Sequence, residues 1–271
     1  MQLSISHTTR YRYASPGSFL VQRLRLTPRD NRSQRVLSWA IETPGMESAA
    51  AYVDGFGNQV HLVTHCRPFE DLLITAAGEI ETNDADGVLG ELDEVASPLV
   101  FRKSTERTQS SPEIDAMAEA LGGGSTLSRL HRLMGQIAEK VRYDTEATAS
   151  ETSAAEAFRA GQGVCQDHAH IFIAGAHRLD IPARYVTGYL LTSGETAAVA
   201  HHAWAEAHIR GLGWVGFDPA NDICPTDRYV RLACGFDAGS AAPITGTHRG
   251  GGKEELVVEV SVRQQQEQQQ Q

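Results

Sequence analysis

Residues 161–191 read GQGVCQDHAHIFIAGAHRLDIPARYVTGYLL, and this stretch gives the strongest structural signal in the chain. After Cys165, apolar residues recur at helical spacing until Pro182, which has no backbone N–H and ends the run. Cys165 is therefore predicted to lie at or near the N-terminus of a helix. There, unpaired N–H groups and the positive end of the helix dipole favour a thiolate and can hold a developing oxyanion.

Two segments further along the chain alternate like β-strands: HHAWAEAHI at 201–209 and GWVGFDP at 213–219. The first presents His202, and the second ends with Asp218 before a proline. An imidazole can give and take a proton near neutral pH, and a carboxylate can orient it. Cys165, His202 and Asp218 are thus the candidate nucleophile, base and orienting residue. Glu206, on the same strand face as His202, is the second choice for the orienting residue.

The connection between these strands decides whether the two side chains can meet. If residues 209–213 form a wide connection with His208 opposite Trp214, then Asp218 is the diagonal neighbour of His202 on one face. A two-residue hairpin at 211–212 places Asp218 on the opposite face. The site therefore requires the wider loop.

The rest of the chain predicts an α+β fold. Residues 1–82 alternate between short extended segments and turn signals, which indicates an antiparallel β domain, either a sandwich or a barrel. Residues 83–111 are acidic and turn-rich and are interpreted as a linker. A second domain is expected over 112–262, with helices capped by Ser111, Ser125 and residue 152 or 153, then strands that include a final EELVVEVSVR. The Gln-rich tail, 263–271, is expected to be disordered.

Composition narrows the possible partners. The formal charge of −10 disfavours a nucleic-acid partner, which requires clustered Lys and Arg. No secretion signal and no apolar run of membrane-spanning length is visible, so we expect a cytoplasmic protein without a membrane partner. The four cysteines form no CxxC pair and the histidines lack a metal-ligand spacing, so neither disulfides, a metal nor a cofactor is expected.

Three motifs, GVCQDHAH, HAWAE and FDPAN in this order, resemble the bacterial transglutaminase-like family, whose members are often labelled candidate cysteine proteases. HTTRYRY, LRLTPR and DGFGN resemble the β-rich region that precedes the core in that family, so the likeness covers most of the chain. The resemblance implies a papain-like core in which a Cys-bearing helix packs on an antiparallel sheet over 112–262. It also implies the roles already suggested for Cys165, His202 and Asp218. One departure is His168, where family members often carry an aromatic residue.

The expected chemistry is thiolate attack on a peptide or isopeptide amide through a thioester. Water as acceptor makes a protease or amidase, and an amine makes a transglutaminase. Short polar turns (GQG, TSGET at 192–196, PANDIC) favour an open, wet groove and hence hydrolysis. Trp204, Trp214 and Tyr189 are the candidate substrate-binding walls, with closure of the core as the alternative for Trp204 and Trp214. The partner is a peptide or protein substrate, and the oligomeric state is left open. A catalytically silent binding scaffold is the competing interpretation.

Overall fold

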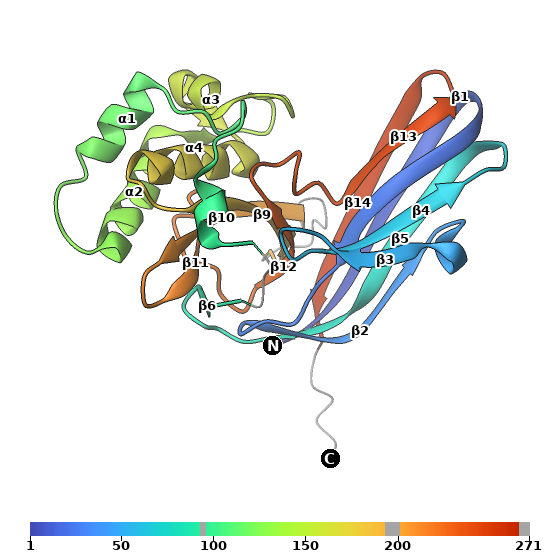
Figure 1. Cartoon of the computed structure of the whole chain (residues 1–271), viewed down its shortest axis with the longest axis horizontal. Helices are drawn as coiled ribbons and strands as arrows, with labels where there is room; N and C mark the ends of the chain where they lie inside the picture. The colour runs from blue at the N-terminus through green and yellow to red at the C-terminus, as the bar shows by residue number, and fades with distance from the viewer. Residues whose placement is uncertain (93–95, 193–200, 266–271) are drawn as a thin grey trace, which may run out of the picture.

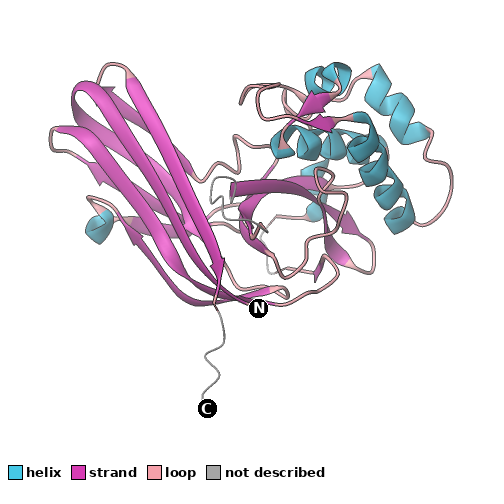
Figure 2. Ribbon diagram, turned by 180° about the vertical axis from the view of Figure 1, so that it is seen from behind, coloured by secondary structure: helices cyan, strands magenta, loops and turns pink. Residues whose placement is uncertain are grey.

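The computed structural model describes residues 1–92, 96–192 and 201–265 and consists of a β domain beside a mixed core domain. Figure 2 shows most of the helices gathered at one end of the molecule and the long strands, with one short helical turn, at the other. No helix among the described residues is long and apolar enough to cross a membrane. Of the expected tail, residues 266–271 lie outside the described residues, as do residues 193–196 of the expected polar turn.

The β domain is one seven-stranded antiparallel sheet. Its longest strand, β1, bends in the middle, and the two halves of that strand pair with different neighbours. The first half of β1 (Gln2–Thr27) pairs with β5 (Phe69–Thr82) and β14 (Glu254–Gln264). Its second half pairs with β4 (Gln59–His65) and β13 (Ile244–Gly250). β2 (Gln34–Glu42) and β3 (Ala50–Val53) complete the sheet, and a 3-10 turn spans Met46–Ser48.

Apolar side chains from both halves of β1 fill the interior of the β domain. Leu3 and Ile5 from the first half share one buried cluster with Leu24 and Leu26 from the second. Alternate residues of each half point inward, as the period of a strand requires. A second buried cluster joins Tyr13 and Leu20 of β1 to Phe69 and Leu72 of β5, so the sandwich holds two apolar clusters.

Two strand placements correct the expected domain boundaries. β13 and β14, which we expected to close the domain at 112–262, pair instead with β1 of the β domain, with Leu3 opposite Gln264 and Tyr13 opposite Glu254. The second correction concerns the expected linker, which contains a strand of the core sheet: β6 (Val88–Gly90) pairs with β11 (Gly213–Phe217). Covering an otherwise open edge of β1 satisfies its backbone groups, which is the physical reason for the return of the C-terminal strands.

The core domain is a five-stranded antiparallel sheet in the order β12-β9-β10-β11-β6, with four helices beside it. The remaining strands are β9 (Ala183–Leu190), β10 (His201–Ile209) and β12 (Tyr229–Gly235). The helices are α1 (Pro112–Glu119), α2 (Thr126–Lys140), α3 (Ala154–Ala160) and α4 (Cys165–Arg178), with a 3-10 turn at Pro98–Arg102. β7 (Arg142–Tyr143) and β8 (Gln162–Gly163) form a short parallel pair.

Local sequence explains how the helices start and how α4 reaches the sheet. The side chains of Ser111 and Ser125 accept hydrogen bonds from the first turns of α1 and α2, and Ser153 does so for α3, so the predicted caps are confirmed. Small residues on β10, namely Ala203, Ala205 and Ala207, share the buried cluster that contains the α4 side chains. Because these residues carry only a methyl group, the helix axis can lie close to the strand.

Candidate active site

Cys165 is the first residue of α4, and the backbone around it is fixed by Asp167. The Asp167 carboxylate folds back to accept hydrogen bonds from the Val164 N–H at 2.8 Å and from the Thr148 hydroxyl at 2.6 Å. A Cβ atom at position 163 would lie 2.7 Å from that carboxylate, so only glycine fits there. The Gly-x-Gly approach thus lets an acidic side chain cap the turn that presents Cys165.

The strand register brings His202 and Asp218 together as predicted. His208 lies opposite Trp214, and the ladder continues to Ile209 opposite Gly213, so the connection is shorter than the five residues expected but keeps the same register. The His202 Nε2 atom lies 2.6 Å from Asp218 Oδ2. Both side chains are buried. The diagonal contact across the two strands is therefore confirmed.

Asp218 is held by more donors than the strand pattern indicated. Its Oδ2 atom also accepts hydrogen bonds from Asn221 Nδ2 at 2.7 Å and from the Tyr229 hydroxyl at 2.8 Å. Its Oδ1 atom accepts from the backbone N–H groups of Ala220 and Asn221. Burial acts to raise the pKa of Asp218, but the hydrogen bonds from His202, Asn221 and Tyr229 outweigh it and lower that pKa.

Two of these supporting residues were missed from the sequence. Asn221 lies in the quoted FDPAN motif, where an aspartate followed by proline predicts a turn in which its oxygen accepts nearby backbone N–H groups. That signal could have identified it. Tyr229 begins β12, and nothing in the neighbouring sequence connects it to Asp218.

The charge state of His202 is set by its two partners. Burial acts to lower its pKa, but hydrogen bonds to Asp218 and to Cys165 outweigh burial and raise that pKa to about 10. Because Nε2 faces Asp218, Nδ1 is the ring nitrogen left for the sulfur. The protonated form of His202 is thereby favoured, beside the cysteine that begins α4.

Glu206 does not serve as a second orienting residue for His202. It is completely buried between two guanidinium groups, 2.7 Å from Arg184 Nε and 2.8 Å from Arg231 Nε. These charges outweigh the burial that acts to raise its pKa, and they lower it. Glu206 is therefore the centre of a structural ion-pair cluster.

The three aromatic residues expected to line a substrate groove are buried instead. Trp204 packs against the rings of His202 and Tyr229, with centroids 6.4 and 5.5 Å away. The Arg184 guanidinium stacks on Trp214, with its carbon Cζ 3.7 Å from the centroid of the Trp214 ring. The Tyr189 hydroxyl hydrogen-bonds to His7. Each side chain is at most 2 % exposed. The expectation is corrected: these large apolar surfaces stabilise the core and offer no surface to a peptide.

Tyr143 is an exposed aromatic residue beside the site that sequence reasoning did not select. It is 41 % exposed and pairs across β7 and β8 with Gly163, two residues before Cys165. Partial burial raises its pKa, and the proximity of Cys165 and Asp218 raises it further. Tyr143 therefore lies within electrostatic range of both the sulfur and the carboxylate.

The other three cysteines lack this environment. All four are free thiols, and Cys66 is exposed on the β domain. Burial and the nearby Asp86 raise the pKa of Cys224 to about 11. Cys234 is buried in β12 with its Sγ atom 3.3 Å from the Phe56 carbonyl oxygen.

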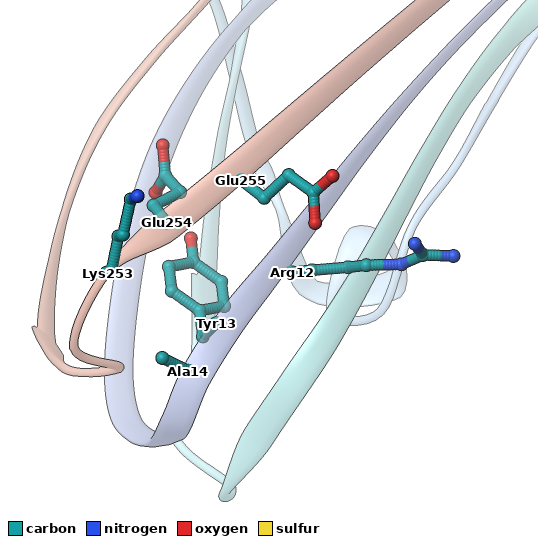
Figure 3. A pocket seen from close by; sticks show the side chains of 6 residues that line it. All are labelled: Arg12, Tyr13, Ala14, Lys253, Glu254 and Glu255. Atoms are coloured by element: carbon teal, nitrogen blue, oxygen red, sulfur yellow. The ribbon is translucent and has the colours of Figure 1, made fainter.

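An open cavity of about 480 Å³ lies at the tip of the β domain, away from Cys165. Its lining mixes charges of both signs where β1 turns back, as Figure 3 shows for Arg12, Tyr13, Ala14, Lys253, Glu254 and Glu255. Neither a cysteine nor a histidine lines this cavity. The cavity therefore lacks the residue types that the Cys165 site uses.

Comparison with known proteins agrees with this architecture. Residues 3–81 match the bacterial transglutaminase-like N-terminal region, and residues 115–219 match the transglutaminase-like superfamily. The uncharacterized protein ML0607 of Mycobacterium leprae is 28 % identical over 96 % of this chain and 98 % of its own length. The uncharacterized protein Mb2599c of Mycobacterium bovis is 28 % identical over 89 % of this chain and 86 % of its own.

A solved structure shows the same fold. A protein from Cytophaga hutchinsonii described as a "putative cysteine protease" superposes with a TM-score of 0.76 over 97 % of this chain and 90 % of that one, at 23 % sequence identity. At this identity the likeness concerns the fold. The chain belongs to the transglutaminase-like superfamily, with the bacterial N-terminal region preceding the superfamily core.

Proposed function

We propose that this protein is a cysteine-nucleophile acyl-transfer enzyme that hydrolyses peptide or isopeptide amides, with Cys165, His202 and Asp218 as its triad. Superfamily membership supports a cysteine-dependent enzyme. The observation that carries the finer proposal is the pairing of His202 with Asp218 at 2.6 Å on one side and with Cys165 on the other. That sequence of contacts is what nucleophilic catalysis requires of a nucleophile, a base and an orienting group.

The steps follow from the positions of the atoms. The Cys165 thiolate attacks the amide carbonyl carbon, and the negative charge that moves to oxygen is held by backbone N–H groups at the start of α4, including that of Cys165. The His202 imidazolium gives its proton to the amine as the C–N bond breaks, leaving a thioester. The neutral imidazole then takes a proton from water, and hydroxide attack on the thioester releases the acid and restores the thiolate.

Water as the acceptor is favoured by what surrounds the site. The three aromatic side chains that could have walled an apolar amine channel are buried in the core. The aromatic surface that does lie near Cys165 belongs to Tyr143, which is partly open to solvent. An open site admits water to the thioester, so hydrolysis is expected to outrun aminolysis.

The test supplies purified protein with a peptide pool that includes Gln-containing peptides, together with a fluorescent primary amine. Cleavage, ammonia release and dye incorporation are followed in parallel, with Cys165→Ala as the matched control. We expect hydrolytic products that require Cys165 and exceed dye incorporation. Dominant incorporation at millimolar amine would make the protein a transglutaminase. Absence of both products across the pool would favour the silent scaffold.

A further inference from the structure

We propose that the β domain positions the catalytic residues: Gln34 and Asn58 brace the outer edge of β12, and β12 in turn holds Tyr229 against Asp218 and His202. This inference rests on the proposed function, because it assigns positioning residues to the same triad. It gives the β domain a role within the chemistry beyond that of a separate module.

The braces are two side-chain amides that pair with the backbone of β12. Gln34 Nε2 donates to the Arg231 carbonyl at 2.9 Å, and the Arg231 N–H donates back to Gln34 Oε1 at 2.7 Å. Asn58 makes the same two-way contact with Cys234, both distances being 2.8 Å. An amide side chain carries the same donor and acceptor as a peptide group, so each brace replaces one rung of a missing neighbouring strand.

The braces lie where β12 most needs support. β12 is an edge strand of the core sheet, and its pairing with β9 shifts register between Arg231 and Ala233. One brace lies on each side of that irregularity. A shifted register leaves backbone groups without rungs and weakens a strand locally, so two fixed amides at this place restore its alignment.

Both amides are themselves fixed by the β domain. Each is only 2 % exposed. Gln34 Nε2 also donates to the Arg29 carbonyl at 2.9 Å, and Asn58 Nδ2 donates to Asp54 at 3.1 Å. Asp54 is paired in turn with Arg25 at 3.0 Å. The braces are therefore rigid extensions of the β domain.

Tyr229, the first residue of β12, transmits this alignment to the site. Its hydroxyl donates to Asp218 Oδ2 at 2.8 Å, and its ring lies edge-on to the His202 ring with centroids 5.9 Å apart. Just before it, the Thr82 hydroxyl of the β domain donates to the Asp227 carbonyl at 2.6 Å. Movement of β12 would thus loosen the carboxylate and the imidazole together.

An apolar interface joins the two domains. Val230 and Leu232 of β12 and Tyr189 of β9 belong to one buried cluster with Leu24 and Ile80 of the β domain. Buried apolar area holds the domains together, while the amide braces select the position of the strand, because hydrogen bonds are directional and apolar contacts are not.

The experiment measures how the rate of Cys165 alkylation by iodoacetamide depends on pH, in the full chain. The variants are Gln34→Met and Asn58→Leu, which keep size and neutrality but lose both hydrogen-bonding ends. The control is Gln2→Met, since Gln2 donates to Glu79 within the β domain at 3.1 Å. The titratable groups that face His202 are Cys165, Asp218, Tyr229 and His201, and all stay unchanged.

We expect the half-maximal rate in both brace variants to move to higher pH by about one unit, because a loosened imidazolium stabilises the thiolate less. The control should stay at the wild-type value. Partial unfolding changes the amplitude but not the midpoint of the folded molecules, and two independent variants protect against one that fails to fold.

Two outcomes separate the failure of this inference from failure of the proposed function. If His202→Ala moves the wild-type midpoint upward but neither brace variant does, the β domain does not position the site, and the inference is overturned. If His202→Ala leaves the wild-type midpoint unchanged, the Cys165–His202 pair itself is refuted.

Discussion

Two carboxylates in the core domain, Asp218 and Glu206, have the same exposure but different partners. Both are completely buried. Asp218 is held by a histidine, a tyrosine, an asparagine and two backbone N–H groups, whereas Glu206 lies between two guanidinium groups. Burial alone therefore does not indicate function.

The difference lies in the partners. Arginine stays charged at every accessible pH, so the Glu206 cluster cannot exchange a proton and contributes only to structure. Histidine can gain or lose its proton, so the Asp218 cluster can change charge during a reaction. The substitutions Asp218→Asn and Glu206→Gln each change one of these two carboxylates.

The largest effect is expected from Asp218→Asn. The amide keeps the size of the side chain but cannot support the imidazolium charge, so the rate of amide cleavage should fall by about 10³ to 10⁴. The fold should persist, but the free energy of unfolding should fall by about 1 to 3 kcal/mol, because the amide oxygen can accept from only one of the two sets of donors and the NH2 group then faces the other. A loss of folding that matches the loss of rate would show instead that Asp218 is structural.

Glu206→Gln should lower the stability of the fold and leave the reactivity of Cys165 unchanged. Removing this charge leaves Arg184 and Arg231 without their carboxylate partner, and breaking a buried ion pair costs about 3 to 5 kcal/mol in the free energy of unfolding. Cysteine alkylation per folded molecule should be unchanged.

A surface pair supplies the control for this change. Glu81 pairs with Arg35, and both side chains are more than half exposed. Glu81→Gln should therefore cost less than about 1 kcal/mol by urea denaturation. Equal costs at positions 206 and 81 would contradict the structural role of the buried cluster.

A smaller effect is expected at Tyr143. Truncation to alanine removes an exposed ring beside Cys165 that a peptide can contact, so KM should rise by about threefold to tenfold with kcat nearly unchanged. Tyr143→Phe should behave like the wild type if the ring face makes the contact. A fall in kcat at unchanged KM would assign this residue to the chemical steps.

Local patterns predicted the positions of Cys165, His202 and Asp218 in the fold. The proline at 182 and the helical spacing placed Cys165 at a helix start, and strand period 2 with one loop fixed the register of His202 and Asp218. These features depend on residues near one another in sequence. Local steric and hydrogen-bonding rules are enough to specify them.

Long-range features escaped the sequence analysis. β13 and β14 return to β1 across more than two hundred residues, and Tyr229 reaches Asp218 from a strand braced by the β domain. No local pattern encodes which edge a strand joins. The burial of Tyr189 was missed for the same reason, because the β-domain surface that covers it comes from distant segments, whereas core packing was one of the two interpretations for Trp204 and Trp214.

The central claim, that Cys165 and His202 act as a pair, is tested most directly by labelling the intact protein with substoichiometric iodoacetamide at pH 6 and locating the label by peptide mass spectrometry. We predict that Cys165 is labelled ahead of Cys66, Cys224 and Cys234, and that His202→Ala removes this advantage. Faster labelling of any other cysteine, or an undiminished preference for Cys165 in His202→Ala, would contradict the account.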